Sequence, residues 1–306
     1  MNGEQKGILY SFVAYGIWGL FPLFWKLLEH VNSMEILVSR MIWSFIFTSI
    51  FILLIGQRKL LIEDLKSLWK EKKMFFSLAG ASCVITFNWY IYIWAVNNGH
   101  VIDTSLGYYI NPIITVLCGM ILFKEKLTKA QMLAVIVALI GVLIMAISYG
   151  EIPWISLLLA GSFAIYGVLK KKITLDATRG LAIETLFILP FALVYYIYIM
   201  TTDNMSFLQV NWTTDLLLIL AGVVTAFPLV MFAKGARLLP QSIMGFIQYV
   251  APTLVLIIGV VLFHEPFTKV ELASFCFIWL AVAIFSTSMI IETRKKHLQE
   301  QKTAEV

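Results

Sequence analysis

Charged residues and the residue types that bind metals or form disulfides are scarce in this sequence. Only 13% of its 306 residues are charged, and it contains 3 cysteines and 4 histidines. Soluble domains carry about 25% charged residues. Cys83, Cys118 and Cys276 lie inside apolar runs with no pairing pattern, where a thiol acts as a small hydrophobic group. These absences argue against a disulfide framework, a metal centre and a soluble fold.

Catalytic motifs are missing as well. The chain has no G-x-x-x-x-G-K-[ST] phosphate loop, no H-E-x-x-H, no G-x-S-x-G and no Cys/His metal spacing. We therefore expect no enzyme activity, no cofactor, no bound metal and no nucleic-acid partner. Any active transport would have to use an ion or solute gradient instead of ATP.

Hydrophobic residues are abundant and make up 60% of the chain. A helix needs roughly 20 mainly apolar residues to cross a bilayer, and ten segments meet this requirement. They are 7–28, 33–55, 74–96, 102–123, 129–148, 153–170, 178–200, 215–236, 241–263 and 269–291. The sequence therefore predicts an all-α membrane protein with ten transmembrane helices.

Basic residues predict the orientation of these helices, because they favour the cytoplasmic side. With the N-terminus inside, 20 of the 23 Lys and Arg residues fall on the inner side, and Arg40 lies within a span. This bias predicts that the chain is N-in and C-in. The inner loop 57–73 is either a short interfacial helix or a solvated basic loop. We expect residues 292–306 to form a disordered cytoplasmic tail.

One stretch of the chain occurs twice. Residues 109–129 and 249–269 share eight identities over 21 positions, which form a P…G…LF-x-E-x-x-T pattern. We infer two five-helix halves, 7–148 and 153–291. Because five is odd, the second half would enter the membrane upside down, and such inverted repeats are typical of secondary transporters.

The end of the repeated pattern predicts a turn between paired helices. Thr128 and Thr268 are each expected to cap the helix that follows. We interpret Glu125 and Glu265, which stand just before them, as parts of structural turns.

Polar residues form a stripe along one face of the predicted helix 102–123. Their spacing, i, i+4, i+7 and i+11, places Thr104, Tyr108, Asn111 and Thr115 together. The stripe is either the wall of a substrate cavity or a set of interhelical hydrogen bonds, and we favour the cavity. Its predicted residues are Tyr15, Trp18, Asn88, Thr104, Tyr108, Tyr109, Asn111, Gln248 and Tyr249.

Two prolines at matching positions of the repeat and two charges well inside spans are candidates for function. Pro112 and Pro252 occupy matching positions, and each bends its helix as either a hinge or a static kink. Arg40 and Glu184 are intramembrane charges, which usually mark function. Glu184 is the leading candidate for proton coupling, and a structural polar contact is the alternative. A direct pair between them would require the Arg40 side chain to reach across the midplane.

These features resemble a known family. The ten spans and the P…G…LF-x-E-x-x-T pattern are similar to the drug/metabolite transporter superfamily and its EamA repeat. Tyr15-Gly16-Ile17-Trp18-Gly19, followed by Ser39-Arg40, resembles the RarD branch of chloramphenicol-sensitivity permeases. The resemblance covers residues 7–291 and implies a cavity built from helices one, three, four, six, eight and nine. Because Asn111 is matched by Ala251, and Lys124 by His264, we carry over no substrate.

The sequence thus predicts a secondary active transporter of the bacterial cytoplasmic membrane, a permease or exporter of a small organic metabolite or drug that works by alternating access. The alternative is a non-transporting sensor or scaffold that binds a lipid or small molecule. The expected partners are a small-molecule solute and the lipid bilayer. Protons are the candidate coupling ion, and a homodimer is left open.

Overall fold

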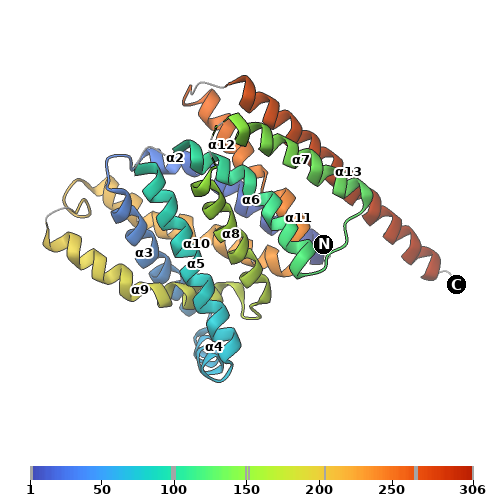
Figure 1. Ribbon diagram of the computed structural model, residues 1–306. Coiled ribbons are helices and arrows are strands. Elements are labelled where there is room, and N and C mark those ends of the chain that lie inside the picture. The colour runs from blue at the N-terminus through green and yellow to red at the C-terminus, as the bar shows by residue number, and fades with distance from the viewer. Residues whose placement is uncertain are drawn as a thin grey trace.

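The chain folds as a bundle of helices. The computed structural model describes residues 3–97, 101–148, 150, 152–202, 205–264 and 268–304. Every regular element in this part of the chain is a helix (Figure 1). Within it, nine helical spans are long and apolar enough to cross a membrane, and Leu106–Leu122 forms a shorter apolar helix. The predicted all-α fold with about ten spans is confirmed.

The helices follow the predicted segments closely. Those of the first half are α1 (Gly3–Gly19), α2 (Phe21–Lys26), α3 (Ser33–Leu54), α4 (Arg58–Lys70), α5 (Lys72–Asn97), α6 (Val101–Leu122) and α7 (Lys129–Ser148). Those of the second half are α8 (Trp154–Lys172), α9 (Ala177–Thr201), α10 (Trp212–Leu238), α11 (Gln241–Ile247), α12 (Val250–Val261) and α13 (Lys269–Ala304). Eight predicted spans form single helices, and two are interrupted.

Each interruption lies just before a proline. The first predicted span divides into α1 and α2 at Leu20, ahead of Pro22. The ninth divides into α11 and α12, ahead of Pro252. A proline ring clashes with the carbonyl group four residues earlier. For Pro252 this is the Gln248 carbonyl, which accepts a hydrogen bond from the Ala251 N–H instead (3.1 Å). Pro112, in contrast, lies within the continuous helix α6.

Two predictions about the polar segments can now be decided. The loop 57–73 contains the helix α4, which the Arg179 side chain joins to α9 through the Asp64 carboxylate (2.5 Å) and the Gln57 side chain (2.7 Å). The prediction of a disordered tail was wrong, because α13 continues to Ala304. Residues 292–304 contain neither Gly nor Pro and are rich in Lys, Glu and Gln, which are good helix formers.

Helices that correspond in the two proposed halves pack against each other. Helix α3 contacts α9, α6 contacts α11 and α7 contacts α13. In Figure 1, α7 and α13 run side by side along one edge of the bundle. Helix α1 packs on α10, as α5 packs on α8. This arrangement is expected of two related halves, whose inverted orientation stays a prediction.

The two copies of the repeated stretch also end with the same local geometry. Lys124 and His264 both adopt left-handed backbone conformations, with φ of 53° and 55°, which non-glycine residues seldom adopt. The Thr128 and Thr268 hydroxyls each accept a hydrogen bond from the backbone N–H three residues later, at 3.2 Å. Both predicted helix caps are confirmed. Glu265 lies outside the described residues.

Glu125 joins three helices, so its interpretation as part of a turn was too narrow. Its Oε1 accepts a hydrogen bond from the Gln241 N–H (2.6 Å) and its Oε2 from the Ser242 N–H (2.9 Å), at the start of α11. Lys171 Nζ, from the end of α8, lies 2.9 Å from Oε1. We call these four residues the Glu125 clamp. A Cβ atom at Gly119 would lie 2.6 Å from Glu125 Oε2, so the glycine of the repeated pattern makes room for the clamp.

The clamp is ionised at neutral pH. Burial of the carboxylate opposes its ionisation, but the Ser242 N–H, the Lys171 ammonium group and the Gln241 N–H together hold the pKa of Glu125 below its usual range. A depressed pKa means that the carboxylate strengthens the clamp at neutral pH and loses this effect only in acid. The clamp therefore does not respond to pH changes near neutrality.

Candidate functional site

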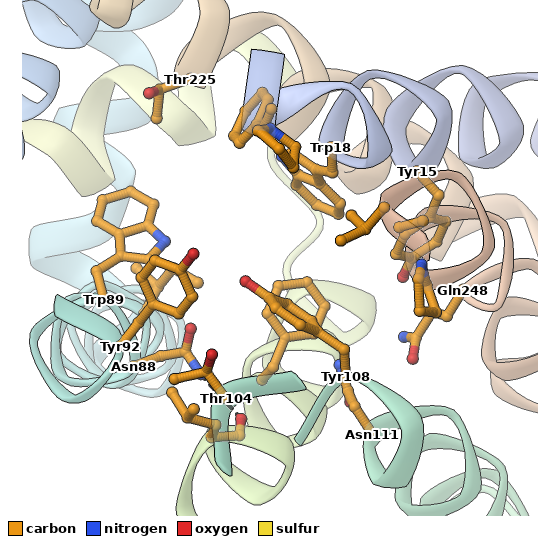
Figure 2. Close-up of a pocket in the computed structure, with 18 of the residues that line it drawn as sticks. Tyr15, Trp18, Asn88, Trp89, Tyr92, Thr104, Tyr108, Asn111, Thr225 and Gln248 are labelled. Carbon is orange, nitrogen blue, oxygen red and sulfur yellow. Dashed lines mark hydrogen bonds between the residues drawn. The ribbon is translucent and has the colours of Figure 1, made fainter. Parts of the chain in front are cut away.

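A cavity of about 270 Å³ lies between the helices (Figure 2). Of the 21 described residues that line it, 8 are aromatic. Ligand sites are typically cavities of this kind, with apolar walls and a few polar groups. The lining residues are Tyr15, Trp18, Phe21, Pro22 and Trp25 of the first span; Arg40 of α3; Ile85, Asn88, Trp89 and Tyr92 of α5; Thr104, Tyr108 and Asn111 of α6; Leu159 and Phe163 of α8; Thr225 and Leu229 of α10; and Gln248, Ala251, Pro252 and Val255 of the ninth span.

The cavity brings together seven of the nine residues that the sequence suggested. Tyr109 and Tyr249 are not among its lining residues. The Tyr109 ring packs edge-on against Phe275 of α13, at 4.9 Å between centroids. Tyr249 is buried beside Phe246. Successive side chains on a helix point about 100° apart, because a turn holds 3.6 residues. Tyr108 and Tyr109 therefore cannot both face the cavity, and the two assignments are corrected.

The polar stripe of α6 lines the cavity in its first part and forms hydrogen bonds at its deeper end, while binding of a substrate in the cavity stays a prediction. Its first part lines the cavity, where the Tyr108 and Tyr92 hydroxyls point inwards from opposite sides (Figure 2). Its deeper end forms interhelical hydrogen bonds. Gln248 Nε2 donates to Thr115 Oγ1 at 3.2 Å, and Thr115 lies 3.3 Å from Asn111 Oδ1. The Gln248 bond joins α6 to the break between α11 and α12, whereas the Thr115–Asn111 bond lies within α6.

Asn88 lines the cavity and also fixes its wall. Its Nδ2 donates to the Leu159 carbonyl (2.8 Å) and to the Ser162 hydroxyl (2.9 Å), so α5 is held against α8. The amide is thus positioned by two hydrogen bonds to a neighbouring helix, which reduces the conformational freedom of the wall.

An aromatic cluster continues from the cavity towards the Glu125 clamp. Trp18 lies edge-on to Phe163, with 5.6 Å between ring centroids, and Phe163 contacts Phe232 at 5.5 Å. Phe232 stacks on Tyr166 at 5.7 Å. Phe232 and Tyr166 are buried. Along α8, Tyr166 of this cluster lies between Phe163, which lines the cavity, and Lys171 of the clamp.

Arg40 lies in the cavity between two indole rings. Its guanidinium carbon is 4.9 Å from the ring centroids of both Trp25 and Trp89. Its Nε donates a hydrogen bond to Thr225 Oγ1 at 2.9 Å. A cation over an aromatic face gains about 0.5–2 kcal/mol, depending on how far it is desolvated. Sequence reasoning missed Trp25 and Thr225, although a charge deep in a span does signal that polar or aromatic partners must surround it.

Glu184 pairs with Lys170 and does not contact Arg40. Glu184 Oε1 lies 2.8 Å from Lys170 Nζ, and the Tyr166 hydroxyl donates to Oε2 at 3.3 Å. The side chains of the pair are 2% and 3% exposed. Lys170 belongs to a run of three lysines and was counted with the inner basic residues. The sequence did hold one indication that Lys170 faces the interior. It follows Tyr166 by four residues, and this spacing places both side chains on one helix face.

Glu184 lies next to the cavity, not in its lining. It borders a small void of about 10 Å³, too small to hold more than about one water molecule. Trp89 and Thr225 line both this void and the cavity. The ion pair is therefore separated from the cavity by a thin layer of side chains.

Comparisons with known proteins assign the family. The model of the EamA-like transporter family matches residues 5–147 and again residues 152–287. The chain belongs to the EamA-like transporter family. It is 45% identical to the uncharacterized transporter YojE of Bacillus subtilis over 286 residues, 94% of this chain and 95% of that one. It is 40% identical to the protein RarD of Escherichia coli over 297 residues, 96% of this chain and 99% of that one.

Two further comparisons agree with this assignment. The chain is 30% identical to the chloramphenicol-sensitive protein RarD of Pseudomonas aeruginosa, over 93% of this chain and 94% of that one. A solved crystal structure superposes with a TM-score of 0.71, covering 93% of this chain and 98% of its own, at 16% identity, which shows the fold alone. The resemblance to the EamA repeat and the RarD branch is confirmed. This EamA protein is a multi-pass membrane transporter of the bacterial cytoplasmic membrane.

The Lys170–Glu184 pair of this EamA transporter gives a first prediction. Replacing Lys170 by Met leaves a buried carboxylate without its partner, which typically costs about 3–5 kcal/mol. We expect Lys170→Met to lower the thermal unfolding temperature of the detergent-solubilised protein clearly. Adding Glu184→Gln should restore most of the loss, because no buried charge then remains unpaired. Additive destabilisation in the double variant would show that the two side chains do not act as a pair.

Proposed function

We propose that this protein is a secondary active transporter that moves a small organic solute by alternating access through the cavity. One observation carries the proposal. The residues that line the cavity lie towards the same end of the bundle, and at the opposite end the helices are joined to one another by ion pairs and hydrogen bonds. In the predicted N-in topology, the cavity lies in the outer halves of the spans and the closed ends face the cytoplasm. The conformation is then outward-facing.

The inner ends are joined by contacts between the two halves and by one contact, from Arg237 to Leu175, within the second half. The Glu125 clamp joins the end of α6 to the start of α11 and the end of α8. The bond between Arg179 and Asp64 joins α9 to α4, and Arg237 Nη1 donates to the Leu175 carbonyl at 2.9 Å. Above them, the aromatic cluster of Trp18, Phe163, Phe232 and Tyr166 fills the interior. These contacts support a closed inner side.

The outer ends differ in a way that fits an outward-facing state. Helices one and nine are interrupted near the cavity, and the segments after the breaks, α2 and α12, contribute to its wall. The end of α1 packs closely on α12, because a Cβ atom at Gly19 would lie 2.7 Å from the Leu254 Cβ. The corresponding helices, α8 and α6, are unbroken at the closed side. In an inverted repeat, a second state would have α6 and α8 interrupted and the first and ninth spans continuous. This exchange would open the cytoplasmic side.

The family assignment and the absence of a nucleotide-binding motif support transport driven by a gradient. A sensor or scaffold that binds a small molecule would also have a cavity, and only flux distinguishes the two functions. Uptake and efflux should be measured in proteoliposomes across a panel of metabolites and drugs, with and without a proton gradient. Unsaturable flux of every solute, independent of any gradient, would contradict the proposal.

The cavity wall gives a sharper prediction. Asn111→Leu and Tyr108→Ala remove polar groups that face the cavity or support its floor. We expect both variants to lose transport while they insert and unfold like the wild type. Tyr198→Ala is the matched control, because Tyr198 is exposed on α9 and does not line the cavity. Full flux in both cavity variants would mean that the stripe serves packing alone.

The Glu125 clamp gives a prediction about gating. In a cysteine-free background with one cysteine at position 111, a membrane-impermeant maleimide should label the protein from the outer side. Glu125→Gln removes the charge that binds Lys171. Labelling from the cytoplasmic side, which faces the medium in inverted vesicles, should therefore rise several-fold. Glu271→Gln is the control, since Glu271 accepts hydrogen bonds from Thr268 at the start of α13. Equal inner labelling in all three proteins would argue against the clamp as an inner closure.

The proton-coupling role of Glu184 is a separate part of the proposal. Glu184 lies 2.8 Å from Lys170 in this conformation, so it would have to separate from Lys170 in another state to accept a proton. We expect Glu184→Gln to transport solute down its own gradient, with the response to a pH gradient removed. Unchanged pH dependence in this variant would exclude Glu184 as the coupling group and leave the ion pair with a structural role.

A further inference from the structure

The cavity carries a positive charge that none of the described residues neutralises with a carboxylate. Of the described residues that line it, Arg40 alone has a formal charge. Three other basic residues that join helices, Lys170, Lys171 and Arg179, each contact a carboxylate at 2.5–2.9 Å. Arg40 has no such partner among the described residues. It contacts the Thr225 hydroxyl and two indole rings, all of them uncharged.

The contacts of Arg40 orient its guanidinium group without using all of its donors. The Nε donor is bound to Thr225 at 2.9 Å. The rings of Trp25 and Trp89, both 4.9 Å away, restrict its position. The remaining donors, on Nη1 and Nη2, have no hydrogen-bond partner within the described part of the chain. A planar guanidinium with two free nitrogens matches the two oxygens of a carboxylate, which it binds through a pair of parallel hydrogen bonds.

The rest of the cavity suits the body of such an anion. Its walls include the rings of Trp18, Phe21 and Phe163, and its apolar surface can accommodate an aromatic group. The Tyr92 and Tyr108 hydroxyls point into the centre and can donate further hydrogen bonds (Figure 2). The volume of about 270 Å³ is below the usual 300–1,000 Å³ of ligand pockets, which restricts the solute to a small molecule.

We infer that the solute is a small organic monoanion with an aromatic body, whose carboxylate binds Nη1 and Nη2 of Arg40. This inference depends on the proposed transport function in one respect, which is that the cavity is the route of the solute. The anion supplies the charge that the cavity lacks, so Arg40 enters a neutral pair when the site is filled. A cationic solute of the same size would meet an uncompensated like charge in a poorly hydrated site, where repulsion is strong.

Matched pairs of ligands test the inference on purified protein in nanodiscs. Binding of benzoate, phenylacetate, cinnamate and indole-3-acetate is compared with binding of their uncharged amides and of benzylamine by isothermal titration calorimetry. We expect wild-type protein to bind at least one carboxylate about tenfold or more tighter than its amide, because hydrogen bonds to a charged partner are the stronger ones. Equal affinity for acids and amides, preference for the amine, or no saturable binding of any carboxylate would overturn the inference.

Variants then assign the preference to Arg40. Arg40→Gln should abolish the discrimination between acid and amide, and Arg40→Lys should keep only part of it, because a point charge replaces the planar fork. Thr225→Val keeps the charge but removes the acceptor of the Arg40 Nε hydrogen bond, so an intermediate loss of the discrimination between acid and amide is expected. This variant keeps the test possible if Arg40→Gln fails to fold. Lys234→Gln is the control, since Lys234 lies over the Tyr10 ring and does not line the cavity. Full discrimination in Thr225→Val and Arg40→Lys would overturn the assignment to Arg40.

Failure of this inference and failure of the transport proposal give different results. If proteoliposomes carry neutral or cationic solutes but no aromatic carboxylate, transport stands and the anion inference falls. If carboxylates bind in an Arg40-dependent manner without saturable flux of any solute, the binding site stands and transport falls.

Discussion

A polar or charged group inside a bilayer has no water to bind and must find its partner within the protein. This constraint explains most of the interior contacts of this transporter. Ser and Thr hydroxyls bond back to carbonyls of their own helices, as Thr48 does to Ser44 and Thr185 to Leu181. Glu184 and Lys170 satisfy each other. Arg40 differs from this pair, because the described residues around it stabilise the cation without neutralising it. An unneutralised charge in a cavity is what a ligand-binding site would require.

The same constraint links the cavity to its closed end. The Glu125 carboxylate is partly buried and therefore needs several donors, which it finds at the first turn of α11 and on Lys171. A helix N-terminus has free N–H groups and favours negative charge. Because these donors belong to the other half of the molecule, satisfying one carboxylate also holds two halves together. Gly119 is part of this contact, since any side chain there would displace the carboxylate.

Local features of the fold were readable from the sequence, whereas features that depend on tertiary neighbours were only partly so. Hydrophobic length predicted the spans, and Thr128 and Thr268 at the end of the repeated pattern predicted the caps of α7 and α13, because each depends on residues close in the chain. Helical spacing also grouped Thr104, Tyr108 and Asn111. The partner of Glu184 could not be found in this way, because Lys170 looked like one of several inner-side lysines. Tyr109 and Tyr249 were misplaced because membership of the repeated stretch was weighed above the direction of the side chain.

Comparison of the two copies of the repeat shows which part of the sequence determines shape and which part does not. Lys124 and His264 adopt the same left-handed conformation although they are different residues, so the turn is set by the shared pattern around them. Pro112 and Pro252 are identical residues at matching positions, yet α6 is continuous and the ninth span is broken. Because the prolines are the same, the difference must come from their surroundings. A proline that is compatible with both a continuous and a broken helix suits exchange between two states, which is the property that alternating access requires.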